Sequence, residues 1–140
     1  MATKEERHQS RITAVETIFS FLGRDKKISA EDCFRHTLQE VEERIEDPFA
    51  WKIVEVATKN LNKIQVILKA YAPEFPIEKI APVNVAILIA GIAEMRFIKT
   101  PPVVVINEYI ELAKIFGEEK SFAFVNGVLD EFRKQILTEK

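Results

Sequence analysis

The chain has 140 residues, of which 47% are hydrophobic and 30% are charged, and its formal net charge is −2. This length supports one domain with a core of its own, but not two well-built ones. We therefore expect a single domain over residues 1–140. The slightly negative charge argues against strong non-specific binding to nucleic acid, because such binding depends on many phosphate contacts.

One cysteine, Cys33, is present, so the chain cannot form an internal disulfide, and no second thiol or histidine stands at metal-ligand spacing from it. We interpret Cys33 as a small hydrophobic residue of the core or its edge. The N-terminal residues lack the apolar run of a secretory signal. The longest apolar run, residues 82–95, is shorter than the roughly 20 residues that span a bilayer. We expect a cytoplasmic protein with no membrane segment, no metal and no cofactor.

The N-terminal part of the chain predicts helices with clear boundaries. The first is expected from about Lys4 to Leu22 and ends at Gly23. The second begins after Ser29, a good N-cap residue, and Asp47 with Pro48 starts the third. The residues expected to face inward are Val15, Ile18, Phe19 and Leu22 in the first helix, and Phe34, Leu38, Val41 and Ile45 in the second.

The remaining segments also follow the helical period. In the third helix, apolar residues recur every three or four positions up to Tyr71, and Pro73 and Pro76 end it. A buried central helix is expected over about residues 82–97, followed by helices over about 103–116 and 121–137. Since no segment alternates as a strand does, the fold class is all-α, with about six to seven helices.

An Asn126-Gly127 pair lies inside the last predicted helix, although Asn-Gly is typical of hairpin turns. Glycine costs about 1 kcal/mol relative to alanine inside a helix. We therefore predict that a second helix approaches Gly127 too closely for a Cβ atom, and that substitution of Gly127 lowers the melting temperature.

Candidate catalytic residues are few. His8 and His36 lie in polar helical surroundings without a nucleophile motif, and no glycine-rich phosphate loop or paired metal-binding histidines are present. Glu94 and Glu108 form a pair of carboxylates, but a helix end or a buried hydrogen-bond network explains them better than catalysis does. We predict that the protein is not an enzyme.

The charges are distributed unevenly along the chain. Residues 31–47 contain seven acidic residues against two arginines, whereas the first helix is mildly basic. Lys4, Arg7 and Arg11 are spaced by three and four, so they share one helical face that could bind a phosphate backbone. Charged stripes of this kind are more often simply solvated.

The C-terminal residues 105–132, VINEYIELAKIFGEEKSFAFVNGVLDEF, carry a long and specific pattern. It is similar to the NusB family of bacterial transcription antitermination factors, whose members have an INEAVELAK-like helix, a glycine-containing turn and an FVNGVLD-like helix. The resemblance extends more weakly through LIAGIAEM, residues 88–95, and RHQSRITAVETIF, residues 7–19.

This resemblance implies a NusB-like fold of two packed small helical bundles, at about residues 4–72 and 77–138. It also implies a non-catalytic, RNA-binding adaptor. Family members pair with the small-subunit ribosomal protein NusE, bind single-stranded boxA RNA and are thereby linked to elongating RNA polymerase during ribosomal RNA transcription. A homodimer that masks the RNA-binding face remains open.

The family's N-terminal arginine-rich motif matches residues 7–11, where only Arg7 and Arg11 retain the guanidinium group. We expect weaker phosphate binding than from a full arginine cluster, because imidazole and amide groups do not form the same bidentate contacts. The residues that the resemblance implies for RNA binding are Arg7, His8, Arg11, Lys120, Phe122, Phe124 and Asn126, and the basic face of the first helix adds Lys4.

The region implied to receive NusE includes Asn84, Ile89 and Ala93, although Ile89 replaces a common arginine and Ala93 a common tyrosine. Because the N-terminal motif retains only two arginines, an alternative function stays open. In that alternative, the chain is a non-catalytic protein-interaction module, a divergent paralogue that has lost RNA binding.

Overall fold

The computed structural model describes residues 2–71, 80–116 and 121–138, and no strand occurs in these ranges. Their α-helices are α1 (Lys4–Leu22), α2 (Ala30–His36), α3 (Pro48–Lys59), α4 (Leu61–Tyr71), α5 (Pro82–Ala93), α6 (Pro102–Phe116) and α7 (Ser121–Thr138). Two π-helical turns, η1 (Thr37–Val41) and η3 (Glu94–Ile98), extend α2 and α5. The all-α prediction is confirmed.

The predicted helix starts match the observed capping contacts. Ser29 accepts a hydrogen bond from the backbone N–H of Asp32 at 3.1 Å, as an N-cap residue does. Asp47 caps α3 in the same way through the N–H of Ala50, at 3.0 Å, and Pro48 follows in the first turn. Local sequence therefore sets both boundaries.

The second helical segment ends earlier than predicted. Its last turn is the π-helical η1, and Glu43 then adopts a left-handed backbone with φ of 54°. The following backbone N–H of Arg44 bonds back to the carbonyl of Leu38 at 2.6 Å. The prediction that Val41 and Ile45 face inward is wrong, because this turn leaves them 54% and 91% exposed.

The expected single helix up to Tyr71 is divided at Asn60. This residue leaves the helical conformation, with φ of −112° and ψ of 20°, and its side-chain amide bonds to the carbonyl of Val56 at 2.8 Å. The apolar positions nevertheless stay inward, since Val54, Ile64 and Leu68 are fully buried. Pro73 and Pro76, expected to end the helix, lie outside the described residues.

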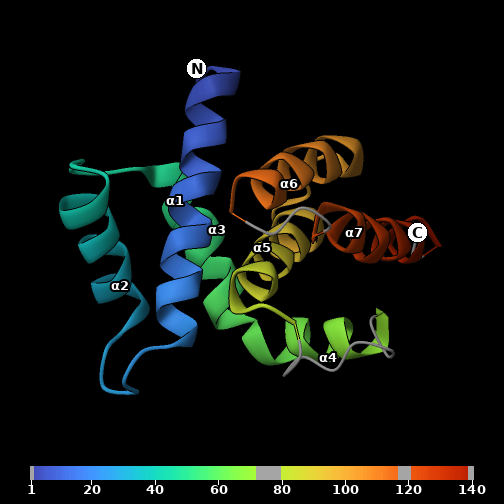
Figure 1. Cartoon of the computed structure of the whole chain (residues 1–140), viewed down its shortest axis with the longest axis horizontal. Coiled ribbons are helices and arrows are strands. Elements are labelled where there is room, and N and C mark those ends of the chain that lie inside the picture. Colours follow the sequence, from blue (N-terminus) through green and yellow to red (C-terminus); the bar gives the residue numbers. More distant parts are fainter. Residues whose placement is uncertain (1, 72–79, 117–120, 139–140) are drawn as a thin grey trace.

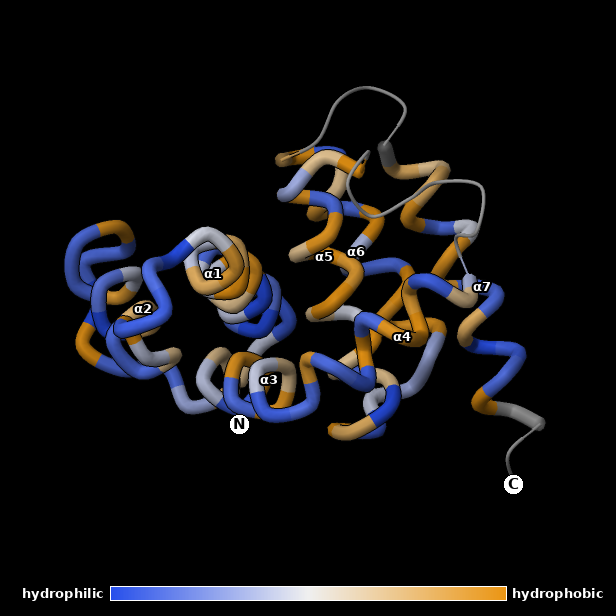
Figure 2. The backbone as a smooth tube through the Cα atoms, turned by 90° about the horizontal axis from the view of Figure 1, so that it is seen from below, coloured by the Kyte–Doolittle hydropathy of each residue, from blue (hydrophilic) through white to orange (hydrophobic). Residues whose placement is uncertain are grey.

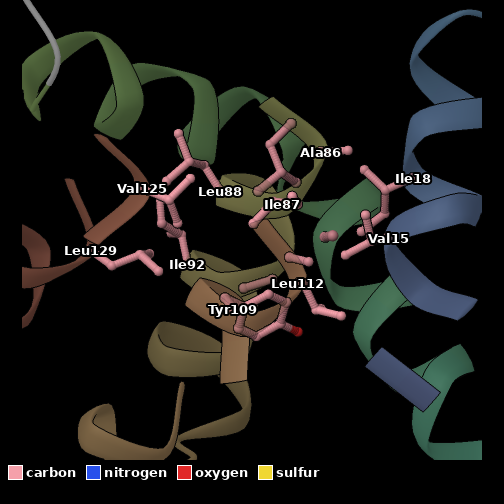
Figure 3. Close-up of a cluster of buried hydrophobic side chains, with 14 of the residues drawn as sticks. Val15, Ile18, Ala86, Ile87, Leu88, Ile92, Tyr109, Leu112, Val125 and Leu129 are labelled. Carbon is pink, nitrogen blue, oxygen red and sulfur yellow. The ribbon is translucent and has the colours of Figure 1, made fainter. Parts of the chain in front are cut away.

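The helix α5 forms the centre of the core, as its apolar sequence predicts. Every residue from Asn84 to Ala93 is buried. Figure 3 shows how α5 residues, including Ile87 and Ile92, meet side chains from α1 on one side and from α6 and α7 on the other. Burial of this kind stabilises the fold by about 25 cal/mol for each Å² of apolar surface removed from water.

The helices lie in two groups (Figure 1). On one side α1 packs against α2 and α3, and on the other α5 packs against α4, α6 and α7. Figure 2 shows the same division from below, with hydrophobic positions gathered around α5. Contacts between α1 and α5 join the groups through one continuous core.

Within the described ranges, no helix has both the length and the apolar character needed to cross a bilayer. The same residues contain no group of three or more His, Cys, Asp or Glu side chains that could hold a metal ion. Cys33 is 3% exposed, which confirms that it packs as a small hydrophobic residue.

Candidate nucleic-acid interface

The first two turns of α1 form a ridge between α3 and α6. Lys4 and Arg7 are exposed on this ridge, and His8 is half-buried. The guanidinium carbon of Arg7 lies 4.1 Å from the centroid of the Phe49 ring on α3. This cation–π contact positions Arg7 against α3 while the side chain stays accessible.

A groove of about 700 Å³ separates the ridge from α6. Its walls consist of Lys4, Glu5 and His8 from α1, and Asn107, Glu108, Ile110, Glu111 and Lys114 from α6. Cationic side chains therefore stand on both walls, since Lys4 and Lys114 belong to different helices. Three carboxylates, Glu5, Glu108 and Glu111, line the same groove, so they outnumber the two lysines.

An aromatic ring lies close to the α6 wall of the groove. The ammonium nitrogen of Lys114 is 5.4 Å from the centroid of the Phe122 ring on α7. Phe122 is 39% exposed, so part of its ring is accessible to solvent. An exposed ring beside a lysine is an arrangement on which an unpaired base can stack.

Arg11 does not share the exposed face of Lys4 and Arg7. Its side chain is directed into the protein and the residue is only 3% exposed. It donates hydrogen bonds to the carboxylate of Glu94 from Nε, at 2.9 Å, and from Nη2, at 2.6 Å. The predicted cationic face thus loses Arg11, because the fully buried Glu94 requires a charged partner inside the core.

Glu94 is the centre of a wider buried network. Besides Arg11, its carboxylate accepts hydrogen bonds from Thr100 Oγ1 at 2.9 Å and from the hydroxyl of Tyr109 at 2.8 Å. The prediction that Glu94 belongs to a buried hydrogen-bond network is confirmed. The network connects α1, η3 and α6.

Burial and charge act together on the groups of this network. Burial alone lowers the pKa of Arg11, but the hydrogen bond and the charge of Glu94 outweigh it, so the pKa lies above its ordinary value. Burial raises the pKa of Tyr109 well above its ordinary value, and the neighbouring Glu94 carboxylate adds to the rise. Arg11 therefore remains charged and Tyr109 remains a neutral hydrogen-bond donor.

His8 joins the groove to the buried network. Its Nδ1 lies 3.1 Å from Oε2 of Glu108, which is also 3.9 Å from Nη1 of Arg11. With a neutral imidazole, this contact makes Nδ1 the protonated nitrogen and leaves Nε2 as an acceptor. These contacts confirm the prediction that Glu108, like Glu94, belongs to a hydrogen-bond network.

The residues predicted near the FVNG motif separate into different environments. Phe122 and Asn126 are exposed on α7, whereas Phe124 is half-buried and packs against the core. Lys120 lies outside the described residues. The prediction of a close helix at Gly127 is wrong, because within the described residues no atom of another helix lies within 4 Å of a Cβ added there.

A model of the NusB family matches residues 8–134. The chain belongs to the NusB family. Curated relatives named transcription antitermination protein NusB agree with this. The protein from Koribacter versatilis is 33% identical over 96% of this chain and 92% of its own length. The protein from Bacillus licheniformis is 33% identical over 94% of this chain and 98% of its own length.

Solved structures confirm the NusB fold. NusB from T. maritima superposes with a TM-score of 0.82 and 27% identity, over 96% of this chain and 93% of that one. A crystal structure of antitermination factors NusB and NusE in complex with double-stranded RNA contains a chain with a TM-score of 0.83 and 25% identity. That match covers 95% of this chain and 99% of the other.

The three residues expected to receive NusE lie in the core of this NusB chain. Asn84 is 6% exposed, and Ile89 and Ala93 are fully buried. They occupy positions along α5, which is covered on all sides. A surface for a partner must therefore be formed by other residues.

Sequence reasoning missed two residues of this interface, Lys114 and Phe49, and the pairing of Arg11 with Glu94 behind it. Lys114 stands within the family-like helix of residues 105–116, and its three-residue spacing from Glu111 indicates an exposed position. Phe49 gave no local signal, because only the packing of α3 beside α1 brings it to Arg7. The role of Glu94 as a partner of Arg11 likewise depends on two helices that are 83 residues apart.

Proposed function

We infer that this chain is a non-catalytic, RNA-binding factor of transcription antitermination that acts together with NusE. The observation that carries this function is the groove between α1 and α6 in a chain of the NusB family. Lys4 and Lys114 face the groove from opposite walls, and Phe122 lies near Lys114. Arg7 is exposed on the same part of α1, where its side chain lies against Phe49 of α3. Its relative in the solved complex is described with both NusE and RNA.

The groove suits a polynucleotide on physical grounds. Lysine and arginine neutralise phosphates, and each such contact releases counterions and makes binding salt-dependent. An exposed aromatic ring stabilises an unpaired base by about 1–3 kcal/mol without selecting its sequence. Lys120 is two residues before Phe122 in the sequence, and we propose that it contacts a phosphate as well.

The proposal also assigns a surface to NusE. A second groove, of about 470 Å³, lies beside the second half of α1 and is lined by apolar side chains of Phe19, Val41, Val83 and Phe116. Phe19 and Val41 are 48% and 54% exposed, which is unusual for large apolar residues unless a partner covers them. NusE binding here explains both the exposure and the failure of Phe19 to face inward.

We further propose the type of RNA that this chain binds and the assembly in which it acts. The preferred RNA is a single-stranded boxA-type element, whereas the relative was solved with double-stranded RNA. The complex acts in the cytoplasm during ribosomal RNA transcription and is tethered indirectly to elongating RNA polymerase. A homodimer that uses either groove is an alternative assembly.

Binding of a short boxA-like RNA, with and without NusE and over a salt series, tests the function. We expect weak binding by the chain alone, tighter binding with NusE, and affinity that decreases as salt increases. A double-stranded RNA of the same length serves as the comparison. Measurement of the molecular mass in solution distinguishes a homodimer from the complex with NusE.

A second candidate function is a protein-interaction module that has lost RNA binding. The burial of Arg11 favours it, because Arg7 is then the only exposed arginine of the N-terminal motif. In that case NusE binds, but RNA does not bind in either condition. That result contradicts the RNA-binding function and leaves the partner interaction intact.

A further inference from the structure

We propose that Arg11 is a positioning residue of the RNA-binding groove: with Glu94 it fixes α1 against η3 and α6, and it does not contact RNA itself. This inference rests on the proposed RNA-binding function. It reassigns a residue that the N-terminal motif places among the phosphate contacts, and it adds Glu94 and Tyr109 to the residues on which binding depends.

Burial is the first argument for a positioning role. Arg11 is 3% exposed and Glu94 is fully buried, so neither offers a surface to a polynucleotide. A guanidinium that moved out to a phosphate would leave the Glu94 carboxylate charged and without its cation inside the core. Separating a buried ion pair in this way is strongly unfavourable.

The geometry of the network is the second argument. Arg11 contacts both oxygens of Glu94, at 2.9 Å and 2.6 Å, which is the bidentate arrangement that a planar guanidinium forms with a carboxylate. Thr100, just after η3, and Tyr109, on α6, complete the hydrogen bonds of the same carboxylate. One buried group therefore fixes three elements in a single relative orientation.

The network also reaches the groove itself. Oε2 of Glu108 lies 3.9 Å from Nη1 of Arg11 and 3.1 Å from Nδ1 of His8. His8 and Glu108 both line the groove, on opposite walls. The contact from Arg11 through Glu108 to His8 thus orients a groove side chain and sets the spacing between Lys4 and Lys114.

A groove whose two walls are held in place loses less entropy on binding than one whose walls move independently. Loss of the network should therefore weaken RNA binding without removing any phosphate contact. The number of phosphate contacts is read from the slope of log affinity against log salt concentration. That slope distinguishes a positioning residue from a direct contact.

The test measures RNA affinity over a salt series, in the presence of NusE, at a temperature where circular dichroism shows each variant to be folded. For Glu94→Gln we expect an affinity about three- to tenfold lower. If Arg11 contacts RNA directly, Glu94→Gln should instead raise the RNA affinity, because removing the buried acid releases Arg11 toward the RNA. For Arg11→Met we expect weaker binding with an unchanged salt slope.

Tyr109→Phe keeps the ion pair and removes only one donor, so it remains informative if Glu94→Gln does not fold. We expect an affinity about twofold to threefold lower for this variant. Tyr71→Phe is the matched control, since Tyr71 packs edge-on against Phe132 on the far side of α5 from the network. It should leave RNA affinity unchanged.

Three results overturn the inference. A salt slope that is flatter by about one unit in Arg11→Met indicates a lost phosphate contact. An unchanged affinity in folded Glu94→Gln or Tyr109→Phe assigns the network to stability alone. Absence of RNA binding by the parent protein with NusE overturns the proposed function, and this inference with it.

Discussion

Gly91 on α5 lies directly against Leu129 on α7. A Cβ atom added at Gly91 would be 3.2 Å from Cδ2 and 3.4 Å from Cδ1 of Leu129, which is fully buried. Cδ2 of the Tyr109 ring would lie 3.6 Å from the same added Cβ atom. This contact, and not one at Gly127, is the place in the C-terminal helices where a glycine allows close packing.

Gly91→Ala should therefore destabilise the protein. Overpacking a well-filled core costs about 1–3 kcal/mol. The change also gains about 1 kcal/mol of helix propensity, so we expect a net loss of about 1 kcal/mol in the free energy of unfolding. Denaturant unfolding measures this difference, and an unchanged midpoint would show that Leu129 can move aside.

Gly127→Ala should have the opposite effect. The position is exposed, inside α7, and has no positive φ, and no described residue of another helix lies within 4 Å of an added Cβ. Alanine then contributes its full helix propensity, about 1 kcal/mol, and the melting temperature rises. A lower melting temperature would restore the original expectation of close approach. Gly91→Ala, measured in parallel, provides the contrasting case.

Glu94→Gln should strongly reduce stability. The substitution leaves Arg11 buried and charged without its carboxylate, and breaking a buried ion pair in this way costs about 3–5 kcal/mol. Glu111→Gln is the control, because Glu111 forms an exposed ion pair with Lys114 at 3.3 Å. Such surface pairs contribute at most about 1 kcal/mol. Equal effects of the two variants would contradict the structural role of Glu94.

Glu16 should make stability depend on pH. Burial raises its pKa from 4.5 to about 7, the nearby Glu42 carboxylate adds to the rise, and Arg44 opposes it. Because the folded-state pKa exceeds the unfolded-state value, this contribution to stability is complete below pH 4.5 and is lost as the pH rises through about 7.

Glu16→Gln removes this titration, so the variant should gain melting temperature relative to the parent between pH 5 and pH 8, a range that brackets the pKa of about 7. Glu40→Gln, at an exposed position of η1, controls for the loss of one negative charge. A parent–variant difference that stays constant across this range would show that Glu16 does not titrate there.

Arg7→Ala should weaken RNA binding in a salt-dependent way. If Arg7 contacts one phosphate, affinity decreases and the slope of log affinity against log salt becomes flatter by about one unit. Arg35→Ala is a suitable control, since Arg35 is an exposed arginine on α2 that pairs with Asp32. An identical slope for Arg7→Ala and the parent would remove Arg7 from the interface.

The positions of most helices could be predicted from local sequence. Ser29 and Asp47 cap helices through their own side chains, and the apolar run of residues 82–95 matches α5, which is buried from Asn84 to Ala93. These signals are short-range: each depends on residues within one or two turns. The family pattern in residues 105–132 is longer, since it covers parts of α6 and α7, and it indicated the fold and the class of function.

Two errors in the predicted helices arise where local periodicity meets a backbone irregularity. The π-helical η1 and the left-handed Glu43 turn Val41 and Ile45 outward, although their spacing fits an inward stripe. Asn60 divides what periodicity presents as one helix, because the stripe continues across the break. An apolar pattern records which side chains prefer burial, but not whether the backbone remains regular between them.

The sequence by itself determined an all-helical NusB chain with basic residues on its first helix. Only the tertiary structure decided which of those residues reach the surface. Arg7 and Arg11 are four positions apart on one helix, yet Arg7 stacks on Phe49 at the surface and Arg11 pairs with Glu94 in the core. The reason is physical: a buried carboxylate needs a cation, and only the packing of α1 against α5 and η3 determines which arginine supplies it.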